Sequence, residues 1–421
     1  MRRGQDTVGW FTVWIRAGTG RRAAGLGHSL AMRRTLAALL CLALVVATAG
    51  VSIDPGRQVP AASSTAPTDQ PPAALVALPA RPTTLSVVAA GDLFVQPALT
   101  AQAAADARAA GKPGHDFTQI LAPLTPMVRQ ADLAVCHIEQ PLAPPEGPFT
   151  GWPIFSAPPQ LADAAADTGF DTCSTASNHT LDYGEEGVHR TLDNLDRVAL
   201  RHSGSARSAQ EAATPNVFDV HGVKIAQLAY TFSFNGINRP AGKPWIANLI
   251  DVEKIRAEAH AAKQAGAEIV ILSMHWGTEY QNQPDQGQTG LAADLLASPD
   301  IDLIIGMHVH VVQPFEKIGD KWVAYGLGNL LVRFADGSPQ NTQDSVVPQF
   351  TFTEVAPSTW RVTDVAVHAF FMRYYPQPRL VDVAAATRDA TPGADYAGIF
   401  RRITGYVNMR GAEAAGLRMV R

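Results

Sequence analysis

Two histidines separated by one residue follow a strongly apolar run in the C-terminal half of the chain. Residues 302–313 read Asp-Leu-Ile-Ile-Gly-Met-His-Val-His-Val-Val-Gln. The aliphatic stretch Leu303–Ile305 predicts a strand buried on both faces, and Gly306 permits a sharp turn at its end. His308 and His310 then project at the carboxyl end of this strand, where α/β sheets bind ligands. Two neutral imidazoles can hold a divalent transition metal there, although two loop histidines without a ligand explain this pair equally well.

Four further polar side chains follow other predicted buried strands. The strands are expected at residues 84–90, 133–136, 170–174 and 268–273, and the side chains are Asp92, Glu139, Asn178 and His275. Because the carboxyl ends of parallel strands meet at one edge of a sheet, we expect these residues to share a pocket with the two histidines. Two carboxylates, one amide and three imidazoles suit Zn²⁺, Mn²⁺, Fe or Co²⁺ better than Ca²⁺.

Such a pocket predicts hydrolytic chemistry on an anionic substrate. Two divalent ions against two carboxylates leave net positive charge and can activate a shared water for in-line attack. His179, directly after Asn178, is free to protonate the leaving oxygen or to stabilise developing charge. Taken singly, an Asp after glycine or an Asn before a helix is as readily a turn or capping residue. The combination therefore carries the prediction.

The remaining pattern alternates helices with strands. Helices are expected at 97–110, at 117–130 with proline interruptions, at 159–168 ending on Gly169, and at 187–198, 252–264 and 291–296. Hairpins are expected within 217–230 and 315–326, and further strands at 350–355 and 362–371. Residues 375–421 show weak periodicity, which predicts a peripheral helix and tail.

The first 82 residues carry targeting features and no core pattern. Met-Arg-Arg from Met32 precedes an apolar run over 36–49, and Ala47-Thr48-Ala49 has the form of a signal-peptide cleavage site. Residues 35–53 carry no charge and approach the ~20 needed to span a bilayer, so a retained anchor is the alternative to the favoured cleavage. Translation starts at Met1 or at Met32. Residues 54–82 are rich in Pro, Ala, Ser and Thr, which predicts a flexible tether.

These features define the predicted organisation. It comprises an N-terminal extension with a signal peptide or anchor at 1–53, a linker at 54–82, one domain at 83–372 and a peripheral C-terminal segment at 373–421. The predicted location is extracytoplasmic, at the cell envelope, with the protein either secreted or attached to the membrane by the uncleaved segment.

Composition excludes some classes of function. The chain has 421 residues, 46% hydrophobic residues and a net charge of −4, which gives no basic footprint for nucleic acid. Three cysteines without a Cys-x-x-Cys pair exclude a disulfide scaffold and a zinc finger. Cys136 and Cys173 fall on strands expected to be neighbours, and export would permit a disulfide. Their apolar surroundings favour buried free thiols.

Together the motifs resemble a known superfamily. Gly91-Asp92, Asn178-His179, His275 and Gly306-x-His308-x-His310 resemble the ordered motifs of calcineurin-like metallophosphoesterases. The chain more specifically resembles the CapA family of poly-γ-glutamate capsule biosynthesis proteins over roughly residues 85–371. The segments that carry this resemblance are GFDTCSTASNHTLDYGEEG (169–187), HWGTEY (275–280), IIGMHVHVVQPFE (304–316) and YGLGN (325–329).

The resemblance implies a fold and a set of roles. The fold would be a four-layer α-β-β-α sandwich of two mixed sheets with helices outside. Asp92 and His310 would hold one metal ion. Asn178, His275 and His308 would hold the other, Glu139 would bridge the two ions, and His179 would be the catalytic imidazole.

Three positions depart from the pattern. The superfamily opens with Asp-x-His, whereas Phe94 stands here, and the CapA family shares that lack. His137 replaces the usual Asn before x-Glu, and Val309 replaces the usual Pro between the final histidines. His137 either supplies the missing ligand or packs in the core, and packing is the favoured interpretation. Because the first metal site has fewer ligands than usual, the centre is expected to hold either one ion or two.

The resulting functional hypothesis is an extracytoplasmic, metal-dependent, phosphoesterase-like protein. The resemblance implies a role in biosynthesis or export of poly-γ-glutamate or a related anionic envelope polymer. Its substrate would be a phosphoester or that polymer. The alternative is a non-catalytic component of a membrane synthesis and export complex, in which the same cationic crevice binds the anionic polymer.

Overall fold

The computed structural model describes residues 81–334 and 341–421. The predicted signal segment and almost all of the predicted linker lie outside these residues. Within the described ranges no helix combines the length and hydrophobicity that crossing a bilayer requires.

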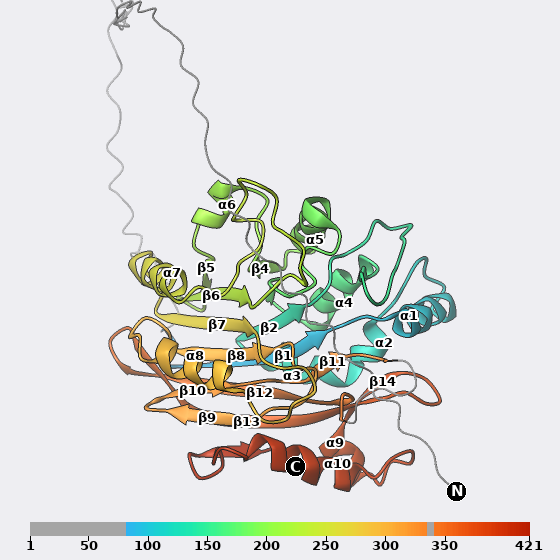
Figure 1. Cartoon of the computed structure of the whole chain (residues 1–421). Helices are drawn as coiled ribbons and strands as arrows, with labels where there is room; N and C mark the ends of the chain where they lie inside the picture. The colour runs from blue at the N-terminus through green and yellow to red at the C-terminus, as the bar shows by residue number, and fades with distance from the viewer. Residues whose placement is uncertain (1–80, 335–340) are drawn as a thin grey trace, which may run out of the picture. The chain divides into compact units, whose positions relative to one another are not determined.

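The strands of the described residues form two mixed sheets (Figure 1). The nine-stranded sheet has the order β14-β13-β12-β1-β2-β3-β4, with β11 beside β1 and β15 beside β13. Its strands are β1 (Thr84–Leu93), β2 (Leu133–Ile138), β3 (Thr172–Ser174), β4 (Arg201–Ser203), β11 (Asn329–Leu331), β12 (Asp344–Ala356), β13 (Thr359–Arg373), β14 (Arg379–Asp382) and β15 (Leu417–Met419). The pairs from β1 to β4 are parallel, whereas β12 is antiparallel to both β1 and β13.

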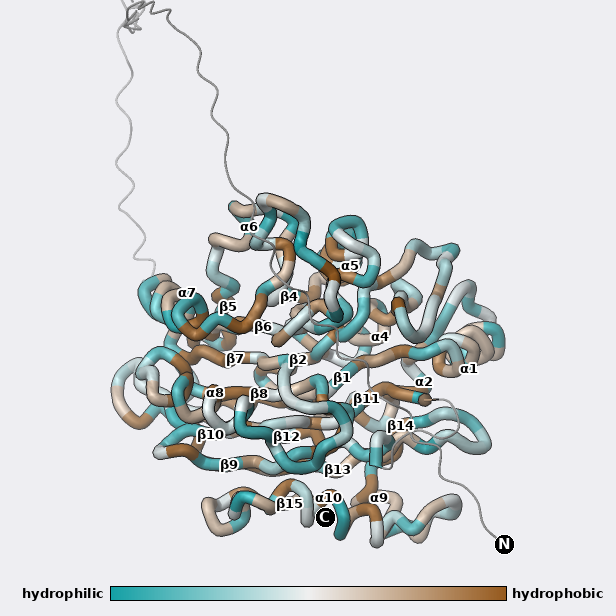
Figure 2. Tube along the Cα trace, viewed as in Figure 1, coloured by the Kyte–Doolittle hydropathy of each residue, from teal (hydrophilic) through white to brown (hydrophobic). Residues whose placement is uncertain are grey.

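The second sheet has six strands in the order β5-β6-β7-β8-β10-β9. They are β5 (Val217–Val220), β6 (Val223–Thr231), β7 (Ile269–His275), β8 (Leu303–Met307), β9 (Phe315–Ile318) and β10 (Lys321–Ala324). The central strands β6, β7 and β8 are parallel and almost wholly buried, as their continuous apolar runs predict. Figure 2 shows hydrophobic residues concentrated along β6 and β7.

Helices cover the outer faces of both sheets. The helices are α1 (Pro97–Ala109), α2 (Thr118–Leu121), the 3₁₀ helix η1 (Ala122–Leu124), α3 (Thr125–Gln130), α4 (Gln160–Thr168), α5 (Gly184–Arg197), α6 (Ala209–Ala213), α7 (Val252–Gln264), α8 (Gln286–Leu296), α9 (Val383–Arg388) and α10 (Tyr396–Val407). Residues of α1 to α5 pack with the nine-stranded sheet, and residues of α7 and α8 pack with the six-stranded sheet.

The alternation of side chains along β1 shows how the layers are built. Val87 and Ala89 point into the core between the sheets, where Ile271 of β7 also lies. Val88 and Ala90 face the helical side, because successive side chains of a strand point to opposite faces. The predicted four-layer α-β-β-α sandwich of two mixed sheets is therefore confirmed.

The C-terminal segment holds more structure than its weak periodicity predicts. In addition to a helix, it contributes β14 and β15, which both pair with β13. Ile403 and Val407 of α10 are fully buried in the core that the two sheets share. The segment is thus part of the packed domain.

The prediction of free thiols is wrong. Cys136 of β2 and Cys173 of β3 form a disulfide, with their Cα atoms 4.4 Å apart. The two residues stand directly opposite each other in the parallel pair, at a separation that a disulfide can bridge. Apolar surroundings indicated burial correctly, but they do not exclude this pairing.

Candidate metal centre

The two sheets meet at the site through the ends of four strands. Asp92 near the end of β1 is paired in register with His137 of β2 and with Asn329 of β11. His275 is the last residue of β7 and stands opposite Met307, the last residue of β8. Both carboxylate oxygens of Asp92 lie 3.4 Å from the backbone nitrogen of His308, so the first sheet contacts the loop that leaves the second.

Close backbone approach requires glycine on both sides of this junction. A Cβ atom at Gly306 would lie 1.9 Å from the Tyr325 carbonyl oxygen, and one at Gly91 would lie 2.0 Å from the Gly328 carbonyl oxygen. The loop after β8 is also unusual, because His308 and His310 have φ angles of 92° and 59°. Left-handed backbone at residues other than glycine costs roughly 1–3 kcal/mol each and is concentrated at functional sites.

Buried atoms with free lone pairs mark the site. Within the described ranges, five buried side-chain atoms of the cluster have no hydrogen-bond partner. They are His137 Nε2, Glu139 Oε1 and Oε2, His275 Nδ1 and His308 Nδ1. Each unpaired buried polar atom costs roughly 1–3 kcal/mol unless a ligand satisfies it. The chemistry of this set, carboxylate oxygens with imidazole nitrogens, fits a borderline divalent cation.

Among the residues that the structure describes, three overlapping groups of side chains could hold a metal ion, and within each group the ligand atoms lie within 4.8 Å of one another. They are Asp92 with His137 and His275, Asp92 with Glu139 and His310, and Glu279 with His308 and His310. Five of the six predicted metal ligands therefore fall in these groups. The sixth, Asn178, lies beside them, because its Oδ1 accepts a hydrogen bond of 2.8 Å from His275 Nε2.

His310 is oriented by a residue that was not predicted to belong to the site. Its Nδ1 donates to Asn329 Oδ1 at 2.9 Å, and Asn329 Nδ2 donates to the His310 carbonyl oxygen at 3.0 Å. His310 Nε2 then lies 3.7 Å from Glu139 Oε1. The YGLGN segment carried the signal for Asn329, but an isolated asparagine indicates no partner.

Electrostatics divide the imidazoles into two kinds. Burial lowers the pKa of His137 to about 4, and burial together with neighbouring imidazoles lowers the pKa of His275 and His308 well below the usual value. These three rings are neutral at pH 7. For His310 the effect of burial is outweighed by the nearby carboxylates Glu139 and Asp92, which raise the pKa of His310 to about 9. Burial raises the pKa of Glu139. The adjacent Glu139 and His310 therefore retain a proton at neutral pH.

The predicted catalytic histidine is held at the edge of the cluster. His179 Nδ1 donates to Asp182 Oδ2 at 2.8 Å, and the same carboxylate oxygen accepts from the Phe155 backbone nitrogen at 2.7 Å. The Phe94 ring lies between the two imidazoles, with its centroid 6.1 Å from that of His179 and 5.2 Å from that of His310. His179 Nε2 is left as the nitrogen that can exchange a proton with a substrate.

Glu279 and Asp182 were missing from the predicted set. Both lie in segments that carry the family resemblance, but their spacing offers no independent reason to place them beside the histidines. Asp182 follows His179 by three residues within a turn, so only the folded loop shows the pairing. Glu279 lies beyond the end of β7, in a loop. The periodicity of the sequence does not predict the path of that loop.

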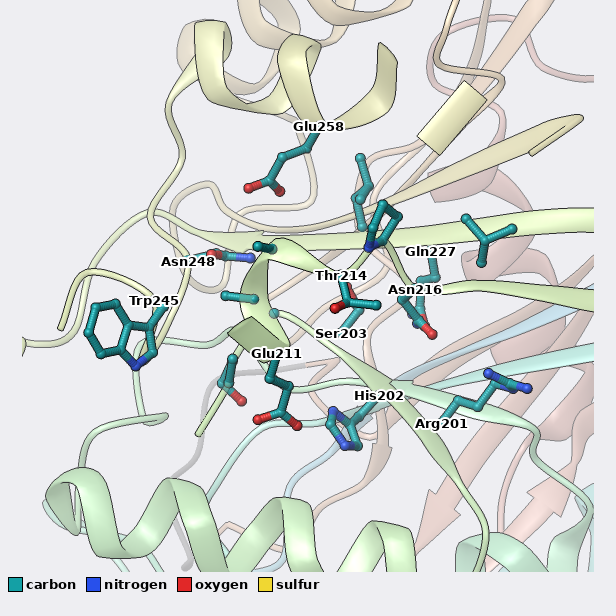
Figure 3. Close-up of a pocket in the computed structure, with 18 of the residues that line it drawn as sticks. Arg201, His202, Ser203, Glu211, Thr214, Asn216, Gln227, Trp245, Asn248 and Glu258 are labelled. Atoms are coloured by element: carbon teal, nitrogen blue, oxygen red, sulfur yellow. The ribbon is translucent and has the colours of Figure 1, made fainter. Parts of the chain in front are cut away.

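A separate cavity lies away from this centre. About 570 Å³ in volume, it is bordered by β4, α6 and β6, and includes Trp245, Glu211 and Glu258 (Figure 3). Glu211 is paired with Arg207, and Glu258 accepts a hydrogen bond from the Tyr230 hydroxyl. None of the predicted site residues lines this cavity, so it is separate from the candidate metal centre.

Comparison with known proteins identifies the family. The family model described as "Bacterial capsule synthesis protein PGA_cap" matches residues 86–333, a range that contains every residue of the candidate centre. The chain belongs to this family. The family assignment agrees with the resemblance drawn from the motifs.

Two of the relatives are Bacillus proteins. The chain is 30% identical over 204 residues to the "PGA biosynthesis protein CapA" of Bacillus subtilis (strain 168). This match covers 48% of this chain and 52% of that protein. The chain is 28% identical over 199 residues to the "Capsule biosynthesis protein CapA" of Bacillus anthracis, covering 46% and 47%. The chain thus matches about half the length of these relatives.

Solved structures include similar chains at low identity. One is the calcineurin-like phosphoesterase YfkN from Bacillus subtilis, with a TM-score of 0.44 and 14% identity. The match covers 76% of this chain and 97% of that one.

Proposed function

We propose that this protein is a metal-dependent phosphoester hydrolase that acts at the cell envelope, in the biosynthesis or export of an anionic polymer. The observation that carries the hydrolase proposal is the convergence of unpaired, buried lone pairs from Glu139, His275 and His308 at the junction of two sheets. A packed core without a ligand would leave all of these atoms desolvated and unsatisfied.

Asp92, Glu139, His275, His308 and His310 would hold one or two divalent ions, with Asn178 beside them. When bound, such ions supply Lewis acidity toward a phosphoryl oxygen and an attacking water.

The other residues have roles that follow from their contacts. Asp182 accepts from His179 Nδ1, which leaves the lone pair of the neutral ring on Nε2. Once Nε2 has taken up a proton, the imidazolium can give that proton to the leaving oxygen. Asn329 fixes the orientation of His310 in the same way. Both arrangements hold an imidazole in one tautomer, which improves its performance as a base or ligand.

The polymer and the location come from other observations. The two Bacillus relatives carry names that refer to PGA or capsule biosynthesis, which supports poly-γ-glutamate or a related polymer as the biological context. The apolar segment at 36–49 supports an extracytoplasmic location, with the protein either released or held at the membrane. A synthesis and export complex is the partner expected in this context.

Hydrolysis of an aryl phosphate with added Mn²⁺ tests the proposal. We expect turnover by the wild type, a loss of roughly 10²–10⁴-fold in His179→Ala with metal content unchanged, and loss of both metal and activity in His308→Ala. His202→Ala, outside the cluster, is the matched control. Metal binding without turnover by the wild type, together with retention of poly-γ-glutamate, would instead favour the alternative of a non-catalytic polymer-binding component.

A further inference from the structure

The end of β1 contributes a carboxylate to the proposed centre but no nitrogen ligand. Phe94 stands two residues after Asp92, where the superfamily resemblance leads us to expect a histidine. Its ring is stacked on His310 at an interplanar angle of 14°, so it closes that side of the site with an apolar surface. A nitrogen ligand near Asp92 therefore has to come from another strand.

We propose that His137 of β2 supplies this ligand, in a set with Asp92 and His275; the inference rests on the metal centre of the proposed function. His137 is fully buried, and the register of the parallel pair places it directly opposite Asp92. Its Nε2 lies 3.8 Å from Asp92 Oδ1, and its ring centroid lies 4.9 Å from that of His275. A cation between these three groups would be within reach of all of them.

The hydrogen bonds around His137 determine which nitrogen is free. The Ser174 hydroxyl donates to the Cys136 carbonyl oxygen at 3.4 Å, so its oxygen is left to accept from His137 Nδ1 at 2.7 Å. With the proton on Nδ1, Nε2 carries the lone pair, and it is the nitrogen that faces Asp92. Ser174 is thus the hydrogen-bond partner on the far side of the ring that metal-ligating histidines ordinarily have.

Packing alone does not account for this arrangement. A histidine that serves only the core would have both nitrogens satisfied, whereas Nε2 of His137 has no hydrogen-bond partner within the described residues. A leucine fills a similar volume without leaving a polar atom unsatisfied. An imidazole whose lone pair faces a carboxylate and a second imidazole is instead arranged to share a cation with them.

Cobalt binding by the full chain tests the proposal. Affinity is measured by competition with a chromogenic chelator, and the donor set is monitored by the visible absorption of bound Co²⁺. His137→Leu removes both nitrogens at similar volume, and Ser174→Ala removes only the hydrogen-bond partner of Nδ1. The control is His202→Leu, which changes a histidine of β4 outside the cluster. Denaturant unfolding of each variant in EDTA shows whether the variant is folded without metal.

We expect His137→Leu to lose one equivalent of Co²⁺ or to bind it at least tenfold more weakly, with an altered spectrum. Ser174→Ala should bind roughly 10-fold more weakly, and this variant carries the test if His137→Leu does not fold. If His137→Leu binds Co²⁺ with the wild-type affinity and spectrum, His137 is not a ligand, and the metal centre of the proposed function is unaffected. The same result in Ser174→Ala leads to this conclusion if only that variant folds. A wild type that binds no Co²⁺ would overturn the centre as well.

Discussion

Four imidazoles of the candidate centre are each held through one nitrogen and present the other. The neighbours that hold them are Ser174 for His137, Asn178 for His275, Asp182 for His179 and Asn329 for His310. Because a neutral imidazole has one donor and one acceptor nitrogen, each of these contacts decides where the free nitrogen points. The partners are short polar side chains, so small changes in them are expected to alter function without altering the fold.

Asp182→Asn tests this at the catalytic histidine. An amide cannot stabilise the positive charge that His179 acquires when it takes up a proton, and it can favour the other tautomer. We expect kcat for an aryl phosphate to fall by roughly 10²-fold, with bound metal and KM little changed. A matched fall in metal content would show that Asp182 supports the ligands, and unchanged kcat would exclude a role in orienting His179.

Metal affinity is expected to rise with pH. Glu139 and His310 retain a proton at neutral pH, because burial raises the pKa of Glu139 and because Glu139 and Asp92 raise the pKa of His310 to about 9. A cation has to displace that proton, so binding should strengthen from pH 6 toward pH 9 and level off above it. Calorimetry in two buffers of different ionisation enthalpy should report about one proton released per site. A Kd that does not depend on pH would contradict this assignment.

At the scale of elements, the strand ends were predictable and their partners were not. Continuous apolar runs such as Leu303–Ile305 identify buried parallel strands, and parallel strands bring their carboxyl ends together. β4 and β11 have three residues each, too few for any periodicity to show. Glu279 reaches the site through a loop, and the pairing of Cys136 with Cys173 depends on a register that one sequence does not reveal.

The disulfide between β2 and β3 is expected to raise the free energy of unfolding. It closes a loop of 37 residues, which in the chain-entropy model is worth about 3–4 kcal/mol of unfolding free energy. We expect the double variant Cys136→Ser, Cys173→Ser to lose about that amount in denaturant unfolding. The single variants should each lose a similar amount, because either one breaks the bond. Equal stability of wild type and double variant would mean that the pair is not oxidised in the protein.

For the whole molecule, the centre joins two sheets that also share an apolar core and polar contacts such as the buried hydrogen bond from Thr172 of β3 to Gln227 of β6. Asp92 and Glu139 belong to or directly follow strands of the nine-stranded sheet, whereas His275 and His308 end or follow strands of the six-stranded sheet. An ion shared by both sets links the layers directly. Binding should therefore stabilise the domain as a unit and leave no layer unfolding separately.

Thermal and denaturant unfolding with and without metal test this coupling. At a free ion concentration about 100 times Kd, binding to the native state alone adds about 2.7 kcal/mol to the unfolding free energy. We expect one cooperative transition that moves to higher temperature with Mn²⁺ and returns after EDTA treatment. His308→Ala removes a ligand from the six-stranded side and should abolish most of the shift, while His202→Ala should retain it. An equal shift in His308→Ala would place the stabilising ion elsewhere, and two separate transitions would show that the sheets unfold independently of the metal.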